Sequence, residues 1–134
     1  MKRRFVLPAV GVSALAALTM TVAACSGGSD SSGPAPTVPA GALEVDAVAG
    51  LKFDAEEYTF AATDGSVTIA YVNEDTQRHT LVVKDADGII IGDKLEVNKK
   101  GDVEVGTYDL APGEYLLYCD VPGHGDMKAT LTVT

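Results

Sequence analysis

Short stretches rich in β-branched and aromatic residues recur from residue 43 to the end of the chain, separated by Gly, Pro, Asn and Asp. Alternation and clustering of this kind are typical of β-strands, and the intervening residues favour turns. No window of helical period with capping residues reaches a convincing length, although residues 88–98 are ambiguous. We therefore predict an all-β sandwich, antiparallel or mixed, of about seven or eight strands. The expected strands cover residues 43–48, 57–61, 66–72, 79–83, 88–91, 103–110, 114–119 and 128–133.

The N-terminus has the organisation of an export signal. Three basic residues at positions 2–4 precede an apolar run over residues 5–24, and small residues come directly before Cys25. This pattern predicts a cleaved secretory signal peptide over residues 1–24. A membrane-spanning helix is the alternative, since the run nearly has the length that a span requires. The small residues and the polar tract that follows favour cleavage.

The tripeptide Val-Ala-Ala before Cys25 resembles the lipobox of bacterial lipoproteins, in which the signal is cut before the cysteine and a lipid is attached to its sulfur. The resemblance implies that Cys25 is lipidated and anchors the protein to the outer face of the bacterial cytoplasmic membrane, in the periplasm or at the cell surface. Residues 26–42 are almost entirely Gly, Ser, Pro, Ala and Thr, which cannot bury enough apolar surface to fold. We expect residues 25–42 to be the lipidated cysteine and a flexible linker, and residues 43–134 to be one domain.

The charge balance limits the possible partners. Without the signal, seven Lys and Arg residues remain against nineteen Asp and Glu residues, a net charge of −12. Such an anionic surface argues against nucleic acid and against electrostatic binding to anionic lipid. A partner attracted by charge should therefore be basic.

Outside the signal and Cys25, the chain has one cysteine, two histidines and one methionine: Cys119, His79, His124 and Met127. Taken singly, a residue of each of these types more often packs in a core or lies on the surface than binds a metal. Here three of them fall within nine positions, and Cys119 is a lone thiol in an exported protein, which calls for an explanation such as metal ligation. A thiolate, two imidazoles and a thioether suit copper cycling between Cu(I) and Cu(II). We predict a mononuclear copper site for one-electron transfer.

The positions of the candidate ligands relative to the predicted strands indicate how they come together. Cys119 leaves the end of a strand that is apolar on both faces and is therefore expected to be central in its sheet. The chain then reverses through Pro122-Gly123, presents His124 and re-enters a strand at about residue 128. His79 opens another strand, and it reaches the same end of the sandwich if that strand neighbours the strand before Cys119.

The segments Tyr118–Leu131 and Val72-Asn73 followed by His79–Val83 resemble the ligand-bearing segments of cupredoxins, the small blue (type 1) copper proteins such as plastocyanin, pseudoazurin and amicyanin. The resemblance implies a Greek-key sandwich with copper held in a plane by His79, Cys119 and His124, and by Met127 as a long axial ligand. Two residues lie between His124 and Met127 and four between Cys119 and His124, a hybrid of the spacings in the family. Thr80 stands where the family often has Asn, and its hydroxyl is expected to link the two loops.

These features predict a membrane-tethered, monomeric electron shuttle that carries one type 1 copper, exchanges electrons with a basic redox protein and is not an enzyme. A copper-buffering or copper-delivery module is the alternative, and a metal-free scaffold with the same fold is a third. Asp120 and Asp126 are expected to be solvated rather than ligands, and Tyr108 is expected to be structural, with a place on an electron path as the alternative.

Overall fold

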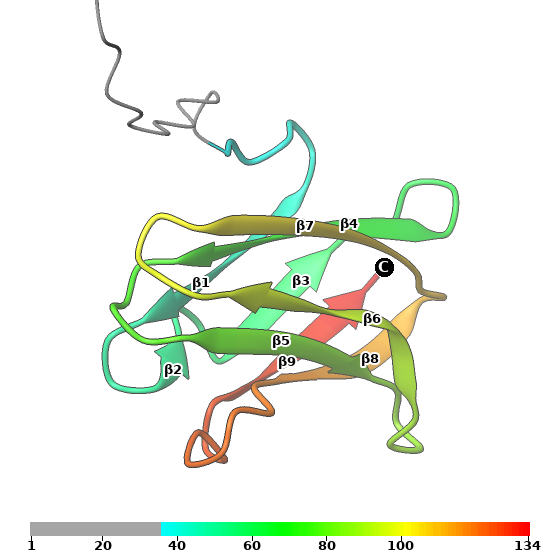
Figure 1. Cartoon of the computed structure of the whole chain (residues 1–134). Coiled ribbons are helices and arrows are strands. Elements are labelled where there is room, and N and C mark those ends of the chain that lie inside the picture. The colour runs from blue at the N-terminus through cyan, green and yellow to red at the C-terminus, as the bar shows by residue number, and fades with distance from the viewer. Residues whose placement is uncertain (1–35) are drawn as a thin grey trace, which may run out of the picture. The chain divides into compact units, whose positions relative to one another are not determined.

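The computed structural model describes residues 36–134, and within that range the chain forms nine strands and no helix (Figure 1). Seven of the eight predicted strands match to within about a residue at each end. One predicted strand continues instead through residues 92–97, and a two-residue strand is additional. The strands are β1 (Leu43–Val48), β2 (Lys52–Phe53), β3 (Glu57–Phe60), β4 (Ser66–Asn73), β5 (His79–Lys84), β6 (Ile90–Val97), β7 (Val103–Asp109), β8 (Gly113–Tyr118) and β9 (Lys128–Val133).

The strands form two sheets, with the orders β2-β1-β4-β7 and β3-β9-β8-β5-β6. Each sheet is mixed, because β1 is parallel to β4 and β3 is parallel to β9, whereas the other pairs are antiparallel. The predicted sandwich is confirmed. The strand before Cys119, β8, is central as expected, although Leu116 on its outer face is exposed to solvent.

The core between the sheets is made by the inward-facing positions of the alternating strands. Burying one such Val, Leu or Ile contributes about 1.5–3 kcal/mol relative to leaving it exposed. Tyr108 packs between β6 and β7, where its hydroxyl donates a hydrogen bond to the carbonyl of Asp93 over 2.8 Å. A Cβ at Gly106 would lie 3.1 Å from the Tyr108 ring. The expectation that Tyr108 is a structural residue agrees with this packing.

One end of the sandwich collects the segments that carry the candidate ligands, and we call it the Cys119 end. There β4 ends at Asn73, β5 begins at His79 and β8 ends just before Cys119. Strand β1 runs toward this end, since Leu43 pairs with Ile69 and Ala47 pairs with Asn73. The chain therefore enters the sandwich about 13 Å before the Cys119 end, at about 3.3 Å per residue for a parallel pair.

The predicted signal peptide and Cys25 lie outside the described residues. Residues 36–42, the described part of the predicted linker, contain no strand, and the Ala42 N–H bonds the Pro39 carbonyl to close a turn. In the described part of the chain no helix is long and apolar enough to cross a membrane.

Candidate metal centre

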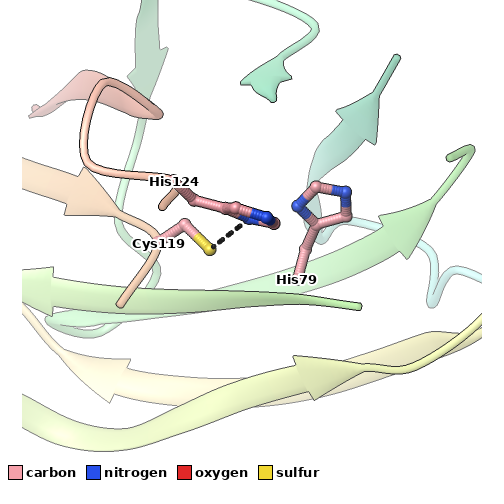
Figure 2. A group of neighbouring side chains, drawn as sticks. All are labelled: His79, Cys119 and His124. Atoms are coloured by element: carbon pink, nitrogen blue, oxygen red, sulfur yellow. Dashed lines mark hydrogen bonds between the residues drawn. The ribbon is translucent and has the colours of Figure 1, made fainter. Parts of the chain in front are cut away.

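Three of the four predicted ligands meet at the Cys119 end. The candidate donor atoms of His79, Cys119 and His124 all lie within 4.8 Å of one another, and all three residues are buried (Figure 2). The two imidazole ring centroids are 4.9 Å apart. His79 is brought there because β5 pairs with β8, with Val82 opposite Tyr118.

A single loop between β8 and β9 positions the other ligands. The N–H of His124 bonds the carbonyl of Val121 over 3.0 Å, and the N–H of Met127 bonds the carbonyl of His124 over 2.9 Å. The N–H of Cys119 then bonds the carbonyl of Met127 over 3.1 Å and closes the loop. Gly123 has φ +90°, a conformation that favours glycine. These bonds hold Cys119, His124 and the fully buried Met127 in one compact segment.

The two nitrogens of His79 have different environments. Its Nε2 lies 3.0 Å from Oδ2 of Asp75, a buried contact that assigns the ring proton to Nε2 because an ionised carboxylate can only accept. The hydrogen bond from His79 lowers the pKa of Asp75, so the carboxylate is charged. Nδ1 of His79 is then an unprotonated acceptor, and it is buried without a hydrogen-bond partner among residues 36–134.

Asp75 is itself held by its loop. Its N–H bonds Oδ1 of Asn73 over 2.8 Å, and its own Oδ1 accepts the N–H of Thr76 over 2.7 Å. Nδ2 of Asn73 donates to the carbonyl of Gln77 over 2.7 Å, which closes the loop from β4 to β5. The orientation of His79 therefore depends on side chains that fold the loop before it.

The sulfur of Cys119 lies beside polar groups. The Thr80 N–H and Nδ1 of His124 are 3.4 Å and 3.6 Å from Sγ. Oγ1 of Thr80 lies 2.6 Å from Oδ1 of Asp120 and accepts the N–H of Asp120 over 2.9 Å. The predicted link between the loops through Thr80 is therefore present. Asp120, which is expected to be solvated, takes part in this link. The hydrogen bond from Thr80, and to a smaller extent the nearby Lys94, lower the pKa of Asp120 below its usual value.

The donors fit a copper ion of the type 1 kind. An orphaned, buried imidazole nitrogen is costly unless a further group occupies the space beside it. Here that nitrogen faces a second imidazole and a thiol, the nitrogen and sulfur donors that copper in electron-transfer sites prefers. Cys119 is the free cysteine of the described residues, so its sulfur is available as a ligand.

Ion pairs surround the Cys119 end. Arg78 pairs with Glu96 at 2.6 Å, and Lys94 pairs with Asp120 at 3.1 Å. Lys100 lies 3.5 Å from Glu74. These pairs are exposed and contribute little to stability, but they offset part of the acidic charge beside the candidate ligands.

Sequence reasoning brought the four candidate ligands together and missed Asp75. Met127 lies in the same loop, and the ligand role of all four residues stays a prediction. The signal that could have found Asp75 is a carboxylate four residues before a candidate ligand histidine, because ligand histidines commonly donate their second N–H to a carboxylate.

Known structures share this architecture. No family model matches the chain, and no curated protein matches it. Auracyanin from the photosynthetic bacterium Roseiflexus castenholzii matches with a TM-score of 0.59 at 23% identity, covering 72% of this chain and 99% of that one. Auracyanin A, a blue copper protein from Chloroflexus aurantiacus, matches with a TM-score of 0.57 at 25% identity, covering 69% and 98%.

A reduced Cu(I) form of an amicyanin variant also matches, with a TM-score of 0.53 at 20% identity, covering 72% of this chain and 86% of that one. The matched region is a sandwich of the same kind in each case. The fold is the cupredoxin β-sandwich, and the resemblance of the ligand segments to cupredoxins is confirmed at the level of the fold, with a His-Cys-His-Met set in place.

Proposed function

We propose that this protein is a type 1 copper protein that carries single electrons on the outer face of a bacterial cytoplasmic membrane. The observation that carries the proposal is the buried Nδ1 of His79, which lies beside Cys119 and His124 and has no hydrogen-bond partner in the part of the chain that the structure describes. Copper bound by this set supplies a one-electron couple between Cu(I) and Cu(II). His79, Cys119 and His124 would hold it, with Met127 as the axial ligand.

The protein's contribution is a buried site whose ligands are held in place. His79 begins a strand, and Cys119 directly follows another, so both are fixed by the sheet. Backbone hydrogen bonds among Cys119, His124 and Met127 hold the loop. Preorganised ligands reorganise little when the charge of the site changes, which favours fast electron exchange. The candidate ligands are also buried, which leaves a substrate little access to a bound ion. We therefore propose a carrier rather than an enzyme.

His124 is the proposed electron exit. Its Nδ1 faces the Cys119 sulfur, and the residue, which lies between Gly123 and Gly125, is 7% exposed. Val121 and Pro122 give the neighbouring surface an apolar rim on which a redox protein could dock. The net charge of −12 without the signal favours a partner with a basic docking surface.

The membrane location rests on the sequence alone, through the lipobox and the linker. A chain of about seventeen residues has a typical reach of about 20–25 Å at 5–6 Å times the square root of its length. That reach allows the Cys119 end to meet a partner held in the same membrane.

Copper delivery is less well supported than electron transfer. A carrier must release its ion to a partner, and release is easiest from exposed ligands. Here His79 and Met127 are fully buried and Cys119 is 4% exposed. The site is therefore built to retain its ion.

A visible spectrum of the copper-loaded protein tests the proposal. We expect one copper per chain and intense colour in the Cu(II) state, because a short bond to the Cys119 thiolate gives strong charge transfer. Cys119→Ser should abolish the colour, whereas the control Asp126→Asn, an exposed residue of the same loop, should keep it. Colour that survives Cys119→Ser would remove the central claim.

A further inference from the structure

The hydroxyl of Thr80 has two hydrogen-bond acceptors nearby but only one hydrogen to donate. Oγ1 lies 2.6 Å from Oδ1 of Asp120 and 3.5 Å from Sγ of Cys119, and either atom could accept its hydrogen. A threonine hydroxyl has one hydrogen to donate. The N–H of Asp120 also points at Oγ1, over 2.9 Å, and this bond uses a lone pair of the oxygen rather than its hydrogen. Only one of the two acceptors can therefore take the proton.

The distances and charges indicate that the Thr80 hydroxyl donates its hydrogen bond to Asp120. A hydroxyl bond to an ionised carboxylate is about 2.5–2.7 Å long and roughly twice as strong as a neutral one. The bond to Asp120 has that length, whereas sulfur at 3.5 Å is a weaker and more distant acceptor. Nζ of Lys94, 3.1 Å from Oδ2 of Asp120, helps to hold the carboxylate in place. Of the groups of Thr80, the backbone N–H is the one that donates to the sulfur.

We propose that Asp120 holds the hydroxyl proton of Thr80 away from the Cys119 sulfur and thereby keeps the thiolate strongly electron-donating toward copper. The inference rests on the proposed function. Hydrogen bonds to a copper-bound cysteine sulfur are one of the factors that tune the reduction potential of such sites. A donated proton would draw electron density from the sulfur and favour Cu(I). Asp120 is thus a positioning residue that keeps the potential low.

Four proteins test this assignment: the wild type, Asp120→Ala, Thr80→Val and the double variant, each loaded with copper. In Asp120→Ala the freed hydroxyl turns to the sulfur, so the sulfur-to-copper absorption band should move to shorter wavelength and the reduction potential should rise. Thr80→Val alone should leave the band where it is in the wild type, because the wild-type hydroxyl does not donate to sulfur. In the double variant the band shift should disappear, leaving only the rise in potential from the lost charge.

Asp126→Ala is the matched control, since it removes the same charge from the same loop at an exposed residue. It should leave the band unmoved. A band that moves in Thr80→Val alone, or that moves equally with Asp120→Ala in both backgrounds, would overturn the proposal. If Asp120→Ala fails to hold copper, the band of Thr80→Val still decides the question. A wild-type protein without a charge-transfer band would instead contradict the proposed function.

Discussion

The side chains of Asp75 and His79 form a buried contact of 3.0 Å, in which Nε2 of the histidine donates to Oδ2 of the aspartate. The contact fixes the tautomer of His79 and leaves Nδ1 free to bind an ion. Asp75 also places a negative charge beside a candidate ligand, which favours the more highly charged state of a bound copper ion.

We expect Asp75→Asn to weaken copper binding by about 10–100-fold, the usual cost of losing such an outer partner, and to raise the reduction potential. The amide cannot accept from both Thr76 and His79 through two oxygens, so one of the present bonds is lost. Competition with a chelator measures the affinity, and a redox titration measures the potential. The control is Glu74→Gln, which removes an adjacent exposed charge. Equal effects of the two substitutions would show that the contact with His79 is unimportant.

Met127→Leu should keep both copper and colour and should raise the reduction potential. Met127 is fully buried, and a swap of similar volume in a core usually costs less than about 1.5 kcal/mol. Loss of a thioether donor and gain of apolar surface disfavour Cu(II). Leu117→Met, at another fully buried position, controls for repacking and should leave the potential unchanged. Complete loss of copper would mean that the expected geometry is wrong, and an unchanged potential and spectrum would show that Met127 is not a ligand.

The sequence predicts the strands best where one face is buried along their whole length. Strands β1 and β9 begin and end where the pattern places them, because apolar and polar positions alternate without interruption. Strand β6 has a partner on one side only, and Gly92, Asp93 and Lys94 in its middle are exposed. The apolar pattern in the sequence therefore ends before residue 92, although the strand continues to Val97. Strand β2 has two residues, too few for any periodicity.

Part of the candidate site could likewise be predicted from the sequence, and part could not. Cys119, His124 and Met127 could be grouped from the sequence because one loop carries them, and His79 could be added through strand order. The roles of Asp75 and Asp120 depend on where two loop carboxylates point. Those directions are set by hydrogen bonds to Asn73 and Thr80, which leave no periodic trace in the sequence.

Asp46 on β1 provides a prediction about pH. Burial, and then the nearby charges of Asp54, Glu44 and Glu74, raise the pKa of Asp46 to about 6. Its Oδ1 is buried without a hydrogen-bond partner in the described residues. The folded protein therefore holds a proton that the unfolded chain releases near pH 4, so this group's contribution to stability falls as the pH rises from about 4 through 6.

Asp46→Asn should raise the free energy of unfolding at pH 7 by about 1 kcal/mol, after allowance for solvent screening of a partly exposed carboxyl. At pH 4 most of the gain should vanish, because the wild-type group is then protonated in the folded protein and only about half ionised in the unfolded chain. Thermal unfolding of the copper-free protein between pH 4 and pH 7.5 measures the difference. Glu44→Gln, an exposed neighbour, should show a smaller dependence on pH. A gain that is the same at every pH would assign the effect to packing instead of charge.

The predicted lipobox implies that the wild-type protein partitions into membranes and carries a mass increment on Cys25. Cys25→Ala should remain as precursor or be released without a lipid, whereas Cys119→Ser should be anchored like the wild type. Membrane fractionation and intact-mass measurement distinguish these results. Recovery of unmodified wild-type protein from the culture fluid, cut at another position, would indicate ordinary secretion.

The docking surface around His124 can be tested with charged residues at the two ends of the sandwich. Gly125 is exposed, and a Cβ there would meet no atom within 4 Å, so Gly125→Arg should leave the loop and the copper spectrum intact. It places a bulky positive charge beside the proposed exit. We expect electron exchange with a cationic cytochrome to slow by about tenfold or more, since like charges placed together at a docking surface cost several kcal/mol and about 1.4 kcal/mol already corresponds to tenfold.

Ala86→Arg is the matched control, because Ala86 is exposed in the β5–β6 loop at the opposite end of the sandwich. It makes the same change in net charge and should slow exchange only slightly. The wild-type rate should fall as salt is added, because screening shortens the range over which the acidic surface attracts the cytochrome. A rate that stays fast and independent of salt in Gly125→Arg, with an intact spectrum, would exclude His124 as the exit. The search would then move to the side of the sandwich that carries Tyr108.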